Sequence, residues 1–133
     1  GVLLGSRLLM TEEALVPSGF HDAIIRADGD ATIKTRVIDV VRGLNWPTEI
    51  TGRALRNRFV ADWQGHEATL AEPATTAREL LRYTRARDGG DTDNTGIFIG
   101  EVAGLLKDVR PADTIVKALV AEAEDLIAGR RPQ

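Results

Sequence analysis

The residues best suited to chemistry stand at the start of the sequence, where glycine and serine end an apolar run. Residues 1–10 read GVLLGSRLLM, a pattern typical of a buried parallel strand. Gly5 would let the backbone approach a ligand closely, and Ser6 offers an N–H and a hydroxyl. Thr11 and the two glutamates after it predict a helix start, whose free N–H groups suit phosphate. The pattern predicts an anion site at a strand end, although an ordinary N-terminal strand that pairs with a later one also fits.

An arginine cluster and one glutamate are the other polar features that stand out. Arg53, Arg56 and Arg58 surround Asn57 and could hold a phosphate or substrate. Ion pairs or hydrogen bonds at a helix end are the simpler expectation for them. Glu101 lies among apolar and glycine neighbours, where a charge is costly unless it is paired.

Hydrophobic periodicity predicts one leading strand, a second extended piece in the first half of residues 31–41, and four or five helices. The expected helices are a short one from Thr11, one from Phe20 to Ala27 capped by Ser18, one from Thr51 through Phe59 and Trp63, one over residues 69–87, and a last one through Ile115 and Ile127. Residues 96–106 form an apolar segment with several glycines, which allow close approach to another element or to a ligand. We expect both tryptophans to be packing anchors.

Composition argues against several classes of function. The 133 residues are about one domain's worth, with 43% apolar and 28% charged residues. The net charge of −3 gives no electrostatic case for binding nucleic acid or an anionic membrane. The lack of cysteine excludes disulfides, thiolate nucleophiles and Cys-based metal sites, and it fits a cytoplasmic location. We expect no metal, no signal peptide and no membrane helix, which needs about 20 apolar residues.

Several segments, in order along the chain, resemble the nitronate monooxygenases (the 2-nitropropane dioxygenase family). Residues 1–14 resemble the family segment G-V-x-x-G-T-R-F-L-x-T-x-E-A. Residues 32–36 are similar to T-V-x-T-R, and residues 51–59 to T-G-R-x-x-R-N-x-F. Residues 98–106 resemble A-G-Q/E-x-x-G-L-I, and residues 111–124 match the start of the closing helix. Together these motifs cover essentially the whole chain.

The resemblance implies an α/β fold, the C-terminal fragment of a (β/α)8 TIM barrel with a mostly helical subdomain. Residues 1–16 would be the last barrel strand and the FMN phosphate loop. Residues 17–95 would be the helical subdomain. Residues 96–133 would be a cleft-facing segment and the closing barrel helix.

The resemblance also implies FMN as the cofactor, with its phosphate bound by Leu3, Leu4, Gly5 and Ser6. The chain departs from the family at Ser6, where Thr is usual, and at Leu8, where Phe is usual. Serine keeps the hydroxyl and the N–H, so phosphate binding is still expected. Glu101 matches a position that is often Gln or Glu beside the flavin cleft, which leaves a cleft role and a salt bridge as open alternatives.

No catalytic residue is expected in this chain. His21 follows Phe20 on an amphipathic helix, and His66 follows Gly65 in a polar turn. Neither matches the catalytic histidine of the family, so both are expected to have surface or packing roles.

The resemblance implies that the whole protein is an oxidoreductase, a flavin-dependent monooxygenase that oxidises alkyl nitronates with O2. The protein partner would be the remainder of the barrel, supplied by upstream residues or by a second chain. Whether the protein also forms a homo-oligomer is left open by the sequence. Two alternatives remain. One is a part of a related FMN barrel that reduces enoyl thioesters with a nicotinamide, and the other is a truncated helical module without catalysis.

Overall fold

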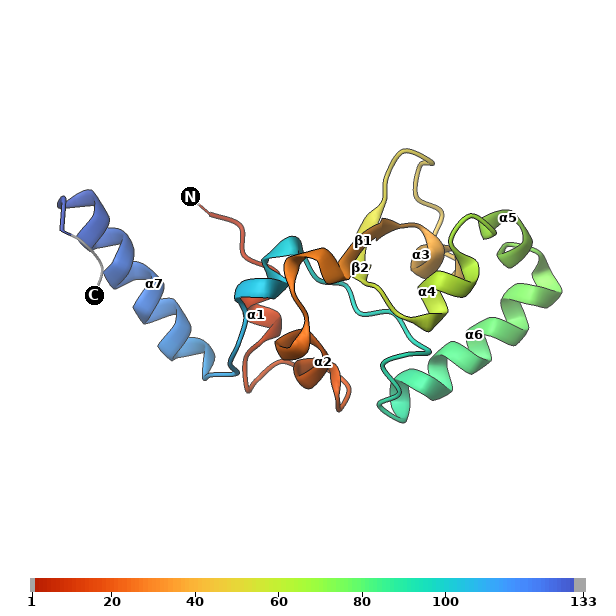
Figure 1. Cartoon of the computed structure of the whole chain (residues 1–133), viewed down its shortest axis with the longest axis horizontal. Coiled ribbons are helices and arrows are strands. Elements are labelled where there is room, and N and C mark those ends of the chain that lie inside the picture. Colours follow the sequence, from red (N-terminus) through yellow and green to blue (C-terminus); the bar gives the residue numbers. More distant parts are fainter. Residues whose placement is uncertain (1, 131–133) are drawn as a thin grey trace. The chain divides into compact units, whose positions relative to one another are not determined.

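The computed structural model describes residues 2–130 (Figure 1). Contacts divide the chain into two compact units, one from residues up to 15 and from 108 onward, the other from residues 16–107. Residues 96–107 belong to the second of these units, and the division into residues 1–16, 17–95 and 96–133 stays a prediction. The roles given to these ranges within a barrel stay predictions.

Helices dominate the described chain, as predicted, and they accompany a single pair of strands. The helices are α1 (Ser6–Leu9), α2 (Phe20–Arg26), α3 (Val37–Val41), α4 (Arg58–Trp63), α5 (Glu67–Leu70), α6 (Pro73–Asp88) and α7 (Ala112–Ile127), with short 3-10 helices η1 (Gly29–Ala31) and η2 (Glu101–Leu105). The strands are β1 (Thr32–Thr35) and β2 (Gly52–Leu55). No helix in this described part is long and apolar enough to cross a membrane.

The predicted leading strand does not form. Residues 2–4 have no regular structure, and α1 begins at Ser6. A strand exists only when its backbone groups pair with a neighbour, and no described residue pairs with residues 2–5. The side chains of Val2 and Leu3 are consequently 86% and 101% exposed. The short helix expected from Thr11 is also absent, because this segment makes a turn in which the Ala14 N–H bonds to the Thr11 carbonyl at 3.2 Å.

In the larger unit, β1 and β2 pair antiparallel, with Thr32 opposite Leu55 and Thr35 opposite Gly52. The second extended piece is therefore confirmed. Residues 97–99 run along the other side of β2, since the Leu55 N–H bonds to the Ile97 carbonyl at 2.9 Å and the Ile99 N–H to the Arg53 carbonyl at 3.1 Å. Figure 1 shows α3 and α4 close to the pair of strands.

The helix predicted from Thr51 is wrong over its first half. Gly52–Leu55 is a strand, and the helix begins only at Arg58. The Asn57 side chain caps that helix by accepting from the Val60 N–H at 3.0 Å. The local pattern fitted a helix, but pairing with two extended neighbours supplies these residues with more backbone hydrogen bonds.

The helix predicted over residues 69–87 divides into α5 and α6. Pro73 occupies the first turn of α6, and Glu72 before it is extended. A proline ring disfavours helical backbone in the residue before it, so α5 cannot run on into α6. The predicted helices through Phe20 and through Ile115 are confirmed as α2 and α7, although Gly19 rather than Ser18 stands at the N-cap of α2.

One apolar core holds α3 to α6 against β2. Its buried members are Val37, Ile38, Val41, Ala54, Phe59, Val60, Leu70 and Tyr83. The Phe59 and Tyr83 rings meet edge to face with centroids 5.4 Å apart. Trp63 packs against this core as expected, but Trp46 is 53% exposed and is not a packing anchor.

Glycines in residues 96–106 let other elements of the protein approach closely. The sequence left open whether they would make room for another element or for a ligand. A Cβ on Gly96 would stand 2.5 Å from the Ile38 side chain. A Cβ on Gly104 would stand 2.8 Å from the Gly29 nitrogen. Side chains at either position would push η1 or α3 away.

Asn57 joins three parts of the larger unit, so its replacement is expected to be costly. Besides capping α4, its amide donates to the Thr92 carbonyl at 2.8 Å and to the carbonyl of buried Thr95. We predict that Asn57→Ala lowers the free energy of unfolding by about 2–3 kcal/mol, from the lost cap and an unsatisfied carbonyl. Urea denaturation of the two proteins measures this loss.

The control is Asn94→Ala, which removes two exposed side-chain hydrogen bonds, one to Asp91 and one from Arg82. We expect a loss of about 0.5 kcal/mol for it. Equal losses for the two variants would contradict the bridging role of Asn57.

Candidate functional site

The segment predicted to bind phosphate is open on the surface of the smaller unit. Leu3 is fully exposed and Leu4 is 38% exposed. No backbone N–H of Leu3, Leu4 or Gly5 bonds to another described residue. A Cβ built on Gly5 would meet nothing within 4 Å. The segment therefore presents free backbone donors beside open space, as an anion or a neighbouring strand would require.

Ionic contacts hold the residues just after this segment. Arg7 donates to the Asp108 side chain at 2.8 Å and to its carbonyl at 3.1 Å, and Arg110 pairs with the same carboxylate. Desolvation opposes ionisation of Asp108, but the hydrogen bonds from Arg7 and Arg110 prevail and lower the pKa of this carboxyl. Asp108 is therefore ionised at neutral pH and keeps residue 7 close to the connector before α7.

Glu13 fastens the same segment to the start of α7. Both of its carboxylate oxygens accept from the Ala112 N–H, at 3.1 and 2.9 Å. The Glu12 N–H bonds to the Arg110 carbonyl at 3.2 Å, and Thr11 forms a parallel bridge with Arg110. An acid at a helix N-terminus also stabilises the helix dipole. The candidate phosphate segment and the last helix thus form one structural unit.

The apolar side of α7 is not covered within its unit. Its exposed members are Val116, Leu119, Val120, Leu126 and Ile127, with Ile127 at 88%. Of these, Val116, Leu119, Val120 and Leu126 line a groove of about 430 Å³ together with Val2 and Leu4. A helix normally buries such a stripe against another element, so this side has the composition of an interface.

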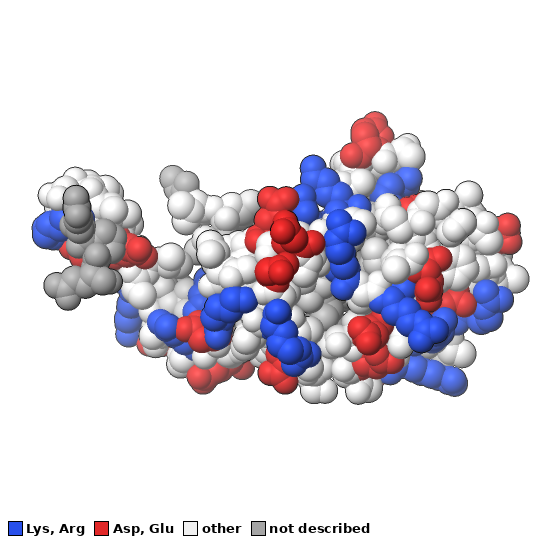
Figure 2. All heavy atoms as spheres, viewed as in Figure 1, with Lys and Arg blue, Asp and Glu red and all other residues white. Residues whose placement is uncertain are grey.

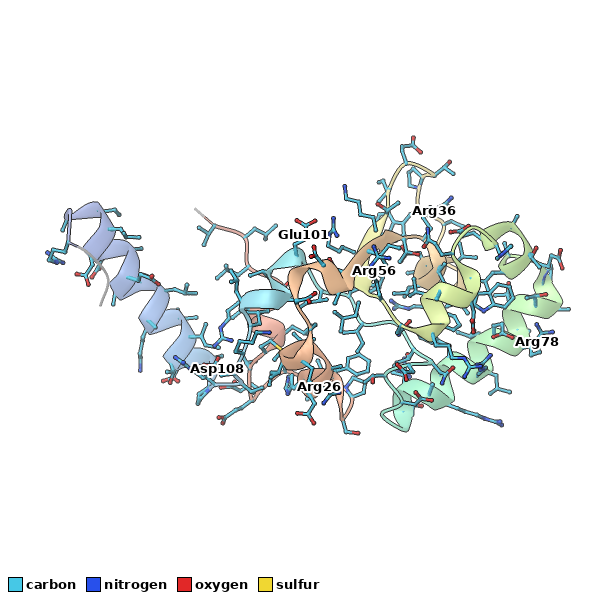
Figure 3. All side chains as sticks on the ribbon, viewed as in Figure 1. Arg26, Arg36, Arg56, Arg78, Glu101 and Asp108 are labelled. Carbon is cyan, nitrogen blue, oxygen red and sulfur yellow. The ribbon has the colours of Figure 1, made fainter. Side chains whose placement is uncertain are left out.

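Glu101 is paired rather than buried. Its carboxylate lies 2.7 Å from the guanidinium of Arg53 and is 69% exposed (Figure 3). Arg53 also donates to the Thr32 hydroxyl at 3.0 Å. Of the two alternatives left open by the sequence, the salt bridge inside the unit is present, and a role for Glu101 beside a flavin stays a prediction.

The arginine cluster divides among separate partners. Arg56 donates from Nε to the Asp30 carbonyl at 3.3 Å, and Arg58 lies 3.8 Å from Asp62 one turn along α4. Arg56 lines a small pocket of about 230 Å³ together with Arg26. The cluster therefore makes the ion pairs and hydrogen bonds expected of it and does not converge on one point.

Both histidines stand away from the candidate phosphate segment in the sequence and lie in the larger unit. His21 is half-buried on α2, and His66 is exposed at the residue before α5. Neither lines the pockets beside Arg26 or Arg36. Charges of both signs alternate over the face shown in Figure 2, with no region of a single sign.

Sequence reasoning missed a second pocket in the larger unit. It has a volume of about 340 Å³ and lies between the end of α3, the loop after it and the junction of α5 and α6. Arg36, Asn45 and Trp46 supply its polar and aromatic lining. A local signal existed in Gly43, which ends α3 with a positive φ of 68°. The contribution of residues 71 and 76 could not be foreseen, because they are distant in sequence.

No family model matches this chain, but individual proteins do. It is 28% identical over 131 residues to the nitronate monooxygenase npaC of Metarhizium robertsii, covering 96% of the chain and 36% of that protein. It is 30% identical over 130 residues to a nitronate monooxygenase of Neurospora crassa, covering 96% of the chain and 32% of that protein. This chain is similar to a portion of a nitronate monooxygenase. The resemblance stated from the motifs is thereby confirmed, and the chain spans about a third of the length of these relatives.

Solved structures support the same fold. The chain superposes on a nitroalkane oxidase of Streptomyces ansochromogenes with a TM-score of 0.69 at 27% identity, over 94% of the chain and 33% of that protein. It superposes on FabK of Thermotoga maritima with a TM-score of 0.68 at 22% identity, over 94% of the chain and 37% of that protein. Both are TIM-barrel enzymes. The chain is therefore an α/β fragment of this barrel fold, as predicted, and its described residues contain one two-stranded sheet.

Asp39 on α3 gives a pH-dependent prediction. It is 8% exposed, and burial raises the pKa of its carboxyl, although the charges of Arg42 and Arg36 oppose this. A raised folded-state pKa stabilises the protein at low pH, and this contribution is lost as pH rises through that pKa. We therefore predict that Asp39→Asn raises the melting temperature at pH 7 and that the gain shrinks towards pH values below about 4.

Thermal unfolding followed by circular dichroism between pH 3 and 8 measures this difference. The exposed Asp62→Asn serves as the control and is expected to show little gain at any pH. A gain for Asp39→Asn that does not depend on pH would contradict the assignment.

Proposed function

We propose that this chain is part of an FMN-dependent nitronate monooxygenase, in which it contributes the site for the FMN phosphate. The observation that carries the proposal is the match of 96% of the chain to two nitronate monooxygenases. The motif that begins at Gly1 and runs to Ala14 is the part of that match from which the phosphate site is inferred. Substrate and activity belong to the whole protein and are therefore included in the proposal.

The residues present fit a phosphate. The N–H groups of Leu3, Leu4 and Gly5 have no partner among the described residues, and Gly5 leaves open space where a side chain would stand. Ser6 would add its hydroxyl. Phosphate oxygens accept several backbone N–H bonds at once when glycine lets the chain come close.

The chemistry of the proposed enzyme belongs to the flavin, which accepts electrons from the nitronate and passes them to O2. The residues of this chain would hold the phosphate end of the cofactor and so fix its position. The contacts of Arg7, Glu13 and Asp108 would restrict the movement of this segment, since they tie it to the start of α7. No residue of this chain is proposed to move a proton in the reaction.

The remainder of the barrel is the proposed protein partner of the smaller unit. The exposed stripe of α7 and the uncovered Val2 and Leu3 would be buried by it. In that setting some of the free backbone donors of residues 2–5 would pair with a neighbouring strand, and those at the end of the strand would be left for the phosphate.

A reductase of the FabK kind is the second candidate that the fold allows. The likeness to FabK, at 22% identity, concerns the fold alone. The two functions are separated by assaying the complete protein with FMN for O2 uptake with propyl nitronate and for NAD(P)H oxidation with an enoyl thioester. We expect only the first reaction, and the second alone would overturn the proposal.

Gly5 is predicted to matter more than Ser6 for holding FMN. In the complete protein, Gly5→Val should weaken FMN binding more than Ser6→Ala, because a branched side chain would occupy the approach of the phosphate. Ser6→Ala would remove one of several hydrogen bonds, worth about 0.5–1.5 kcal/mol. Flavin titrations measure both affinities. If both variants bind FMN as the unaltered protein does, the phosphate site is not here.

The isolated 133-residue chain is predicted not to oxidise nitronates, even with excess FMN. Its proposed contacts reach the phosphate only, so the reactive part of the flavin would not be held against substrate. It also has no residue that matches the catalytic histidine, and loss of a general base typically costs about 10²–10⁴-fold. The measurement is O2 uptake with propyl nitronate. Turnover at about 1 per second or faster, a rate typical of enzymes, would refute it.

A further inference from the structure

Arg36 has a guanidinium that no other side chain neutralises by direct contact. Arg36 is half-buried at the N-cap of α3, where its carbonyl accepts from the Val40 N–H at 2.9 Å, and no hydrogen bond or ion pair joins its guanidinium to another described residue. The charges of Arg36 and Arg42 both act on Asp39, without a direct contact between the Arg36 and Asp39 side chains. A half-buried guanidinium lining a pocket is a ready donor for a planar anion, because its N–H groups form a fork.

Trp46 lies on the same pocket and is held in position by its loop. At the end of α3 the Gly43 N–H bonds to the Val40 carbonyl at 3.0 Å and the Leu44 N–H to the Asp39 carbonyl at 2.9 Å. These two bonds, with a positive φ at Gly43, form a Schellman motif that fixes the chain direction into the loop. Beyond Trp46, the Ile50 N–H bonds to the Pro47 carbonyl at 3.0 Å. The exposed indole is therefore carried by a loop whose start is fixed at α3 and which makes a local turn after Trp46.

The opposite wall belongs to the junction of α5 and α6. Ala71 and Thr76 line it, and the Thr76 hydroxyl donates to the Leu70 carbonyl at 2.6 Å, so that this wall is fixed as well. The volume of about 340 Å³ is that of a small-molecule pocket. Figure 3 labels Arg36, which marks the place of this pocket beside the loop.

We propose that this pocket binds a small aromatic carboxylate, with the carboxylate on Arg36 and the ring against Trp46. One guanidinium and no second cation in the lining favour a single negative charge. The Asn45 side chain adds an amide that can accept or donate beside the charge. The indole offers a flat apolar face for a ring. This site involves neither the candidate phosphate segment nor FMN, so its test is independent of the proposed function.

The test uses benzoate as the probe and records saturation-transfer NMR together with quenching of tryptophan fluorescence. Benzyl alcohol has the same ring without the charge, and acetate has the charge without the ring. We expect benzoate to bind and both analogues to bind at least about tenfold more weakly. Arg36→Gln should weaken benzoate binding by about tenfold or more, because a hydrogen bond to a charged group is lost.

Arg42→Gln is the matched control, since it removes the other charge beside Asp39 but does not line the pocket. We expect benzoate to bind this variant as it binds the unaltered protein. Trp46→Leu tests the ring contact, and because Trp46 lies in an exposed loop this change should not destabilise the fold. We expect it to weaken the binding of benzoate and to leave the binding of acetate unchanged. No binding of benzoate, equal binding of all three probes, or equal losses in Arg36→Gln and Arg42→Gln would each overturn the proposal.

Discussion

The larger unit depends on the backbone hydrogen bonds of Gly52–Leu55. This short strand pairs with Thr32–Thr35 on one side and with residues 97–99 on the other. It thereby joins three segments that are far apart in the sequence and presents Ala54 to the core of α3, α4 and Phe59. Satisfying backbone donors and acceptors is compulsory in a buried strand, so the order of these three segments decides where every neighbouring side chain lies.

Several polar contacts follow from that arrangement. Asn57, two residues beyond the strand, reaches the carbonyls of Thr92 and Thr95 because residues 97–99 are fastened to β2. Arg53, within the strand, meets Glu101 for the same reason. The Glu101 carboxylate remains largely exposed, and a pair with an exposed partner contributes at most about 1 kcal/mol. These pairs therefore favour one arrangement of the loops, while the core supplies most of the stability.

In the smaller unit the corresponding constraint is ionic. Glu13 bonds to the first N–H of α7, and Arg7 bonds to Asp108 before that helix, so that the N-terminal segment meets the start of α7. The apolar stripe of α7 remains open despite these contacts. The smaller unit is thus held by polar contacts and open on its apolar side, and the chain spans about a third of the length of these relatives.

The sequence by itself determined the features that local chemistry controls. The apolar periodicity of Ile115 to Ile127 predicted α7, and the Thr and Ile residues of 32–35 predicted β1. The order of the motifs predicted the similarity to nitronate monooxygenases. Tertiary structure decided what depends on a distant partner. Residues 2–5 are not a strand because no described residue pairs with them, and Gly52–Leu55 is a strand because two segments pair with it. The sequence left a salt bridge of Glu101 open, and the tertiary structure supplied Arg53 as its partner. A hydrogen-bond partner far along the chain leaves no trace in the local pattern, so neither the state of these two segments nor the identity of that partner could be predicted.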